Sequence, residues 1–161
     1  MRKEENILIR DYNQQDLERL YFIVQNTIKK SYADVYPREA IDYFLELHST
    51  RNMEQDIPKG FTFMLESENE ILASGSIVEN EIKRVFVLPR YQGRGFGKKI
   101  MRKIEETALN NGIQKVKLCA SLPSKDFYLS LDYNIVQFTY LKVRNNKKLE
   151  YYDMEKELVK R

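Results

Sequence analysis

A run of alternating glycines constrains the fold of this chain more than any other feature. Gly93, Gly95 and Gly97 follow a short apolar segment at 82–88, and regularly spaced apolar residues follow them from Ile100 onward. The pattern predicts a strand, a tight loop and a helix in succession. Glycine lets the backbone bend and approach a ligand. The N–H groups of such a loop and of the helix start can point at one anion, so we expect an anion site here.

The distribution of charge supports an anion at this loop. Residues 82–104 carry eight basic side chains and no acid, whereas residues 33–81 carry eleven acids against three bases, a net charge of −8. Lys98 and Lys99 stand at the predicted helix start, where cations oppose the helix dipole. A bound phosphate would neutralise both the lysine charges and the positive end of the helix dipole. The alternatives are two solvated faces, or a glycine-rich turn that binds nothing.

Two common phosphate motifs fit poorly. A Walker loop requires Ser or Thr after Gly-Lys, but Lys99 follows Gly97 and Lys98. A dinucleotide-binding fingerprint requires Gly-x-Gly-x-x-Gly after the first strand, and here a Gly-x-Gly-x-Gly follows a late one. Neither motif therefore identifies a ligand for this loop.

Hydrophobic periodicity along the rest of the chain predicts an α/β (α+β) fold. We expect a mixed central sheet of about six to seven strands with helices on both faces, in one domain spanning 1–161. The predicted strands lie at 7–10, 61–66, 71–78, 82–88, 115–120, 135–143 and 149–158. The predicted helices follow Asn13 and Pro37, run from the glycine loop to Asn111-Gly112, and cover 126–131, and a polar loop is expected at 49–59.

Composition excludes several classes of protein. Cys119 and His48 are the only cysteine and histidine, so an internal disulfide, a multi-cysteine zinc site and a multi-histidine metal site are impossible, and we expect no metal. We read no secretory leader and no membrane-spanning segment. A cytoplasmic location and no membrane partner are therefore expected.

Three motifs in this order resemble the GNAT superfamily of acetyl-CoA-dependent N-acetyltransferases. Gln92–Gly97 matches that family's pyrophosphate loop, and Val85–Val87 with Pro89 matches its central strand. The third match is Phe127-Tyr128 followed by Asp132-Tyr133, where the family usually has Gly-Phe in place of the latter pair. Ser121 stands where the family often has Asn.

The resemblance implies two central strands that splay apart around acetyl-CoA. The backbone of Val85 and Val87 would pair with the pantetheine arm, and the loop N–H groups would hold the pyrophosphate. Arg90 or Lys99 would meet the 3′-phosphate. The cofactor-binding residues implied are Val85, Phe86, Val87, Gln92, Gly93, Arg94, Gly95, Phe96, Gly97 and Lys98.

Acyl transfer to an amine requires a proton acceptor and a proton donor. Tyr128 lies where the family places its general acid, and a phenol can protonate a thiolate of similar basicity. Glu81, at the start of the central strand, is the expected base, with Glu79 next. His48 is a further candidate base, and a covalent acyl role for Cys119, which we expect in a buried strand, is a weaker hypothesis. A backbone N–H near Val87 is the expected oxyanion donor.

The acceptor is expected to be a small-molecule or peptide amine. In this family the first two helices form much of the acceptor side, and here their connection holds Tyr32 and Tyr36, which can frame an amine by cation–π contact. The acidic segment 33–81 favours a cationic acceptor or a basic peptide. A non-catalytic acetyl-CoA sensor, and a nucleic-acid-binding module using the basic block, are the alternatives. We expect no nucleic acid partner, and late strands whose edge suits a homodimer.

Overall fold

The computed structural model describes residues 6–159, which form a seven-stranded mixed sheet in the order β1-β2-β3-β4-β5-β7-β6. The strands are β1 (Ile7–Asp11), β2 (Gly60–Ser67), β3 (Glu70–Val78), β4 (Glu81–Val87), β5 (Lys115–Ser121), β6 (Asn134–Lys142) and β7 (Lys148–Glu157). The α-helices are α1 (Leu17–Ser31), α2 (Arg38–Leu47), α3 (Thr50–Asp56), α4 (Phe96–Asn110) and α5 (Lys125–Ser130). The short 3₁₀ turns are η1 (Gln14–Asp16), η2 (Ile57–Lys59), η3 (Pro89–Tyr91), η4 (Leu122–Ser124) and η5 (Arg144–Asn146). The predicted fold class is confirmed.

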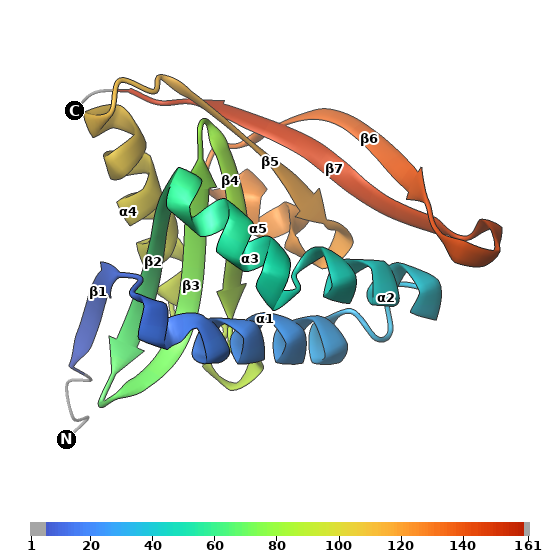
Figure 1. Ribbon diagram of the computed structural model, residues 1–161. Coiled ribbons are helices and arrows are strands. Elements are labelled where there is room, and N and C mark those ends of the chain that lie inside the picture. Colours follow the sequence, from blue (N-terminus) through green and yellow to red (C-terminus); the bar gives the residue numbers. More distant parts are fainter. Residues whose placement is uncertain (1–5, 160–161) are drawn as a thin grey trace.

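Helices cover both faces of the sheet (Figure 1). One apolar core lies between the sheet and α4 with α5, and includes Phe63, Ile100 and Met154. A second core lies on the opposite face beneath α1 and α2, and includes Leu20 and Met64. β2 supplies both cores, because successive side chains of a strand point to opposite faces.

The prediction of a polar loop at 49–59 is wrong, because this segment contains α3. The Ser49 side chain accepts a hydrogen bond from the backbone N–H of Asn52 at 3.2 Å, which caps the helix. Met53 is fully buried and anchors the helix to the second core. A seven-residue helix with one buried side chain shows no apolar periodicity, so its pattern resembles a loop.

The two ends of α4 are defined by glycines with left-handed backbone. Gly95, the N-cap, has φ +85°, and Gly112 after the last turn has φ +77°. At the second end Ile113 N–H bonds to Ala108 C=O at 2.9 Å and Gly112 N–H to Leu109 C=O at 3.0 Å. This pair of bonds is the Schellman arrangement, as expected for a glycine that ends a helix.

The central strands separate after a single paired position. β4 and β5 run parallel and pair only at Glu81 with Lys117. Arg84, in the middle of β4, has φ +52°, and the register between β3 and β4 shifts at this point. This bulge bends β4, so that the remainder of the strand diverges from β5 (Figure 1). The gap between them is where the two cavities described below lie.

Candidate active site

A cavity of about 570 Å³ lies where the splayed strands meet the glycine loop. Segments far apart in the sequence form its wall: α1, the end of β4, the loop before α4, and α5. The lining residues are Thr27, Ser31, Tyr32, Val85, Phe86, Val87, Tyr91, Gln92, Gly93, Gly95, Phe96, Gly97, Lys98, Pro123, Ser124, Phe127, Tyr128, Ser130 and Leu131. Of the predicted cofactor-binding residues, the structure brings all except Arg94 to this cavity.

The glycine loop presents its backbone to this cavity. Gly93 and Gly95 have φ +80° and +85°, and an added Cβ at either would meet nothing within 4 Å. The loop runs directly into the first turn of α4, whose N–H groups have no intrahelical acceptor. Lys98, in that turn, is exposed. Free N–H donors, a helix dipole and a nearby cation together form a site suited to a phosphate group.

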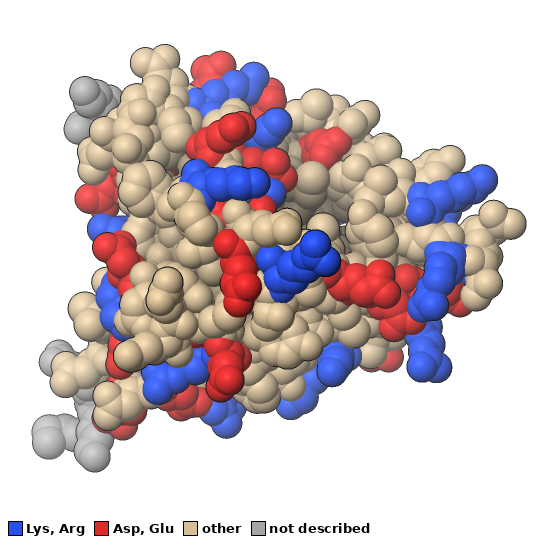
Figure 2. Space-filling model, viewed as in Figure 1, with Lys and Arg blue, Asp and Glu red and all other residues tan. Residues whose placement is uncertain are grey.

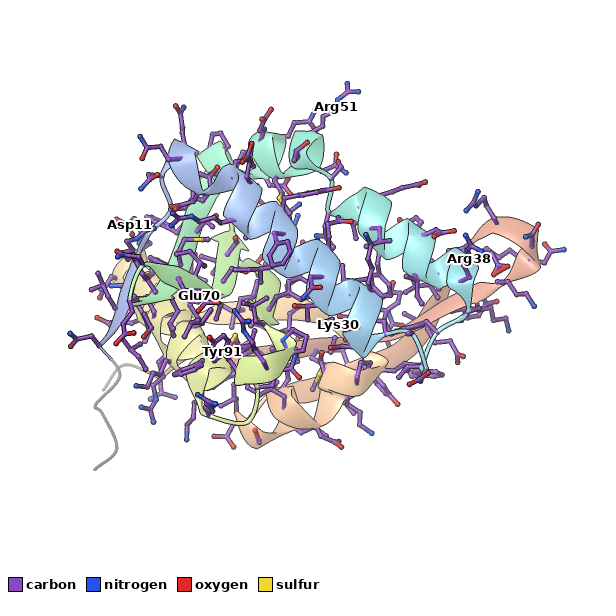
Figure 3. The ribbon with its side chains drawn as sticks, turned by 90° about the horizontal axis from the view of Figure 1, so that it is seen from below. Asp11, Lys30, Arg38, Arg51, Glu70 and Tyr91 are labelled. Atoms are coloured by element: carbon purple, nitrogen blue, oxygen red, sulfur yellow. The ribbon has the colours of Figure 1, made fainter. Side chains whose placement is uncertain are left out.

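A small cluster of side chains braces the start of the loop. The Tyr91 hydroxyl donates to Glu70 Oε2 at 2.9 Å, and the Arg90 guanidinium pairs with the same carboxylate. Figure 3 shows Glu70 and Tyr91 side by side. Gln92 adds a bond from Nε2 to the carbonyl oxygen of Val87 at 3.0 Å. Arg90 is therefore engaged with Glu70, whereas Lys99 is exposed at the start of α4.

A second cavity of about 230 Å³ opens on the α2–α3 side of the gap. Its lining residues are Tyr32, Phe44, Leu47, His48, Asp56, Glu81, Ile82, Lys83, Arg84, Val85, Phe86, Cys119, Ser121, Ser124 and Tyr128. Tyr32, Val85, Phe86, Ser124 and Tyr128 also line the larger cavity. The two cavities therefore meet at these five residues.

Tyr128 stands at this junction. Its side chain is 7% exposed and packs edge-on against Phe127 and Tyr133, with ring centroids 5.0 and 5.7 Å away. No other protein group among residues 6–159 forms a hydrogen bond with its hydroxyl. Burial raises the pKa of Tyr128 well above its ordinary value, and nearby Tyr32 adds to this shift. The phenol therefore keeps its proton at neutral pH and is available as a donor.

The structure separates the two candidate carboxylates. Glu81 is half-buried and lines the smaller cavity, as does Tyr128. Glu79 is exposed in the turn between β3 and β4 and lines neither cavity. Glu81, unlike Glu79, therefore lines the cavity that reaches the shared junction.

His48 is held in a form unsuited to a general base. Its Nδ1 accepts a hydrogen bond from Arg84 Nε at 3.1 Å. Burial, and then the positive charge of Arg84, lower the pKa of His48 to about 3. The imidazole is therefore neutral, and its Nδ1 lone pair is already engaged.

The expectation that Cys119 is buried is wrong. Its side chain is exposed on β5, and Sγ donates to Asp153 Oδ1 at 3.4 Å. Desolvation by surrounding protein, and then the Asp153 carboxylate, raise the pKa of Cys119 to about 12. The thiol stays protonated, which disfavours a nucleophilic role.

The two tyrosines expected at the acceptor have different positions. Tyr32 borders both cavities. Tyr36 lines neither; its hydroxyl donates to the carbonyl oxygen of Glu150 at 2.7 Å and accepts from Leu122 N–H at 2.9 Å. These two bonds join the segment before α2 to β7 and η4, so the Tyr36 hydroxyl is engaged with backbone groups.

Sequence reasoning missed two polar residues of α1, Thr27 and Ser31, which line the larger cavity. Thr27 is 4% exposed, and within the described part of the chain its Oγ1 has no hydrogen-bond partner. Both residues lie on the side of α1 that carries buried Val24 and Ile28. A polar residue on the apolar side of an amphipathic helix is the signal that could have identified them.

No cluster of three or more His, Cys, Asp or Glu side chains in residues 6–159 could hold a metal ion. Over the same range, no helix combines the length and the apolar character needed to cross a membrane.

Solved structures share this fold over nearly the whole chain. A GCN5-related N-acetyltransferase from Rhodopseudomonas palustris is 20% identical, with a TM-score of 0.85, and the match covers 94% of this chain and 95% of that chain. The PaiA N-acetyltransferase from Thermoplasma acidophilum, solved in complex with coenzyme A, is 20% identical, with a TM-score of 0.74 and coverage of 94% and 99%. The yncA protein from Salmonella typhimurium, solved with its cofactor acetyl-CoA, is 15% identical, with a TM-score of 0.71 and coverage of 97% and 96%.

A search of curated proteins found no match to this sequence. The family model described as "Acetyltransferase (GNAT) domain" matches residues 32–158, which include the splayed strands, the glycine loop and Tyr128. The resemblance first seen in three short motifs thus extends over most of the chain, and the chain belongs to the GNAT acetyltransferase family.

Proposed function

We propose that this chain is an N-acetyltransferase that moves the acetyl group of acetyl-CoA to a primary amine, by direct attack within a ternary complex. One observation carries the proposal: two cavities meet at Tyr128, one beneath a loop suited to phosphate and the other lined by the Glu81 carboxylate. Family membership, and relatives solved with coenzyme A or acetyl-CoA, support acetyl-CoA as the co-substrate.

The residues of the larger cavity fit acetyl-CoA. The N–H groups from Gln92 to Lys98 would hold the pyrophosphate at the start of α4. The unpaired edge of β4 at Val85 and Val87 would bind the pantetheine arm as a neighbouring strand would. We assign the 3′-phosphate to Lys99, because Arg90 is engaged with Glu70.

The smaller cavity would hold the amine. Only roughly 0.04% of an alkyl amine with a pKa near 10.4 is neutral at pH 7, so the attacking nitrogen must lose a proton. Glu81, directly or through one water, would take it as the N–C bond forms. The C–S bond then breaks, and Tyr128 would supply a proton to the departing sulfur. A backbone N–H near Val87 would stabilise the negative charge on the carbonyl oxygen.

We propose a small cationic amine or a basic peptide as the acceptor. The net charge of −8 over residues 33–81 supports this class through long-range attraction. Tyr32, at the junction of the cavities, would face the amine. Figure 2 shows acidic and basic side chains interspersed on the face of α1–α3, so the attraction is not that of one uniformly acidic surface.

The first test measures thermal unfolding with acetyl-CoA, using ATP and NAD as controls. A ligand at a hundred times its dissociation constant adds about 2.7 kcal/mol, which for a domain of this size raises Tm by roughly 5–11 °C. A rise specific to acetyl-CoA, followed by thiol release with an amine panel, is expected. No rise would contradict the proposal, and a rise without turnover of any amine would indicate a sensor.

Matched variants then test the catalytic roles. Tyr128→Phe and Glu81→Gln should each lower kcat by about 10²–10⁴-fold while keeping the acetyl-CoA-dependent rise in Tm. Tyr133→Phe removes a buried hydroxyl outside both cavities, and Glu79→Gln changes an exposed neighbouring carboxylate. Both controls should keep full activity. Equal losses in test and control variants would refute the assignments.

The exposed edge strand supports a homodimer. β6 ends the sheet and leaves five large apolar side chains exposed: Ile135, Val136, Phe138, Tyr140 and Leu141. An edge of this kind is a template for strand pairing. We propose that a second copy covers β6. Light scattering should give a dimer that Phe138→Lys dissociates, and a monomeric native chain would contradict this.

A further inference from the structure

The smaller cavity is lined by a buried guanidinium that the protein satisfies only in part. The Arg84 side chain is 3% exposed, its Nη2 pairs with Asp56 Oδ2 at 2.9 Å, and its Nε donates to His48 Nδ1. Its Nη1 is buried and has no hydrogen-bond partner within residues 6–159. An unpaired buried donor of this kind destabilises the fold, the more so when it is charged. Arg84 therefore has donor capacity that a ligand oxygen can use.

The bulge in β4 brings this side chain to the cavity. Ile82 packs in the core beside α4, whereas Lys83 and Arg84 both reach Asp56 on the opposite side, at 3.9 and 2.9 Å. Regular alternation would send successive residues to opposite faces. The φ of +52° at Arg84 breaks that alternation. A left-handed backbone is strained at any residue with a long side chain, and such strain clusters at functional sites.

His48, which lines the same cavity, carries a second hydrogen-bond donor. A guanidinium can only donate, so the Nδ1 that Arg84 contacts carries no proton, and in the neutral ring the proton is on Nε2. The T-shaped contact with Phe86, at 5.6 Å between ring centroids, holds the imidazole at the cavity wall. His48 is thus fixed as a hydrogen-bond donor.

The side chains around Arg84 carry a net positive charge that one anion would neutralise. Arg84 and Lys83 are positive, Asp56 is negative and His48 is neutral, which gives this cluster a net charge of +1. Glu81 lines the same cavity and is the group that would meet an amine. The volume of about 230 Å³ is below the roughly 300–1,000 Å³ typical of drug-sized ligands. The cavity therefore suits a small molecule with both an amine and an anionic group.

We infer, on the basis of the proposed function, that the acceptor is a small amine that also carries a carboxylate, as an amino acid does. Arg84 Nη1 and His48 Nε2 donate to the carboxylate, and the amine lies toward Glu81 and Tyr128. The planar guanidinium matches a carboxylate in a way that an ammonium does not. A zwitterion or a basic amino acid satisfies both this cluster and the acidic segment around it.

The test compares acceptors that differ only in the carboxylate: tyrosine with tyramine, and lysine with cadaverine. Thiol release from acetyl-CoA should give a kcat/KM about 10- to 100-fold higher for the carboxylated member of at least one pair. Arg84→Lys keeps a positive charge beside Asp56 but loses the planar fork and the donor to His48. In this variant, the ratio of kcat/KM for the carboxylated amine to kcat/KM for its decarboxylated partner should be close to one. Acetyl-CoA should still raise its Tm. Arg144→Lys, which alters the exposed ion pair with Asp42, is the matched control and should keep the ratio.

The outcomes separate this inference from the proposed function. Turnover of both members at equal rates, or a preference for the decarboxylated amines, overturns the carboxylate site and leaves the acetyltransferase intact. If no amine is acetylated, the proposed function fails. Binding of the amines, measured by Tm, then tests the carboxylate site separately. With coenzyme A present, tyrosine or lysine should then raise Tm more than tyramine or cadaverine, in the native chain but not in Arg84→Lys. No such difference overturns the inference.

Discussion

Replacing Gly95 by alanine tests whether the glycine loop binds a ligand or merely turns the chain. Gly95 has φ +85°, and an added Cβ meets no protein atom within 4 Å. The substitution therefore creates no clash and adds only left-handed strain, about 1–2 kcal/mol. For a domain of this size, that strain lowers Tm by roughly 2–8 °C.

The same Cβ would occupy space through which the backbone approaches a phosphate. Loss of one charge-assisted hydrogen bond is worth about 1.5–3 kcal/mol, so we expect acetyl-CoA affinity to fall by roughly 10- to 150-fold in Gly95→Ala. Thermal unfolding without ligand measures the strain, and calorimetric titration with acetyl-CoA measures the affinity.

Gly112 provides a matched control at the other end of the same helix. It has φ +77°, an added Cβ again meets nothing within 4 Å, and it lines neither of the two cavities. Gly112→Ala should lower Tm by a similar amount and leave acetyl-CoA affinity unchanged. If both variants lose affinity equally, or if Gly95→Ala loses only stability, the phosphate role of the loop is refuted.

Three further predictions follow from single side chains. Thr27→Val removes the unpartnered Oγ1, so Tm should stay the same or rise while calorimetry shows acetyl-CoA affinity falling by about 2- to 12-fold; unchanged affinity would exclude contact with the ligand. Asp132 has φ +69° after α5. Asp132→Gly relieves left-handed strain of about 1–2 kcal/mol against an entropic cost of about 0.5–1 kcal/mol, so stability should rise by about 0.5–1 kcal/mol in denaturant titration; a loss would show that the Asp side chain compensates its strain. Because the pKa of His48 falls from 6.5 to about 3 on folding, the unfolded chain binds more protons between these values, and stability should decline as pH falls through that window. His48→Gln, which still accepts from Arg84, should weaken that decline in unfolding curves recorded from pH 7 to 4; an identical decline would refute the assignment.

The parts of the fold that the sequence predicts are those fixed by local pattern. Gly93, Gly95 and Gly112 mark turns that only a left-handed backbone closes, and each has a positive φ in the structure. Period-two alternation also predicts faces when it is followed strictly. In β5, Val116 and Leu118 are buried between exposed residues, and that alternation puts Cys119 outside. Cys119 is exposed because only alternate residues of β5 are buried up to Ala120, whereas the prediction assumes a strand buried on both faces.

The parts that the sequence does not predict depend on contacts between distant segments. Arg84 belongs to β4, His48 caps the end of α2 and Asp56 ends α3, a helix whose sequence pattern resembles a loop. They meet because β4 bulges at Arg84. The sequence does not predict this bulge, because arginine disfavours a φ of +52°. Such a conformation persists only where the surroundings hold it, here through Asp56 and His48. The proposed cofactor side is built on a local motif that can be recognised in the sequence, whereas the proposed acceptor side is assembled by tertiary structure. The charge of a whole segment therefore favours a cation, but the charges at the cavity itself favour a zwitterion.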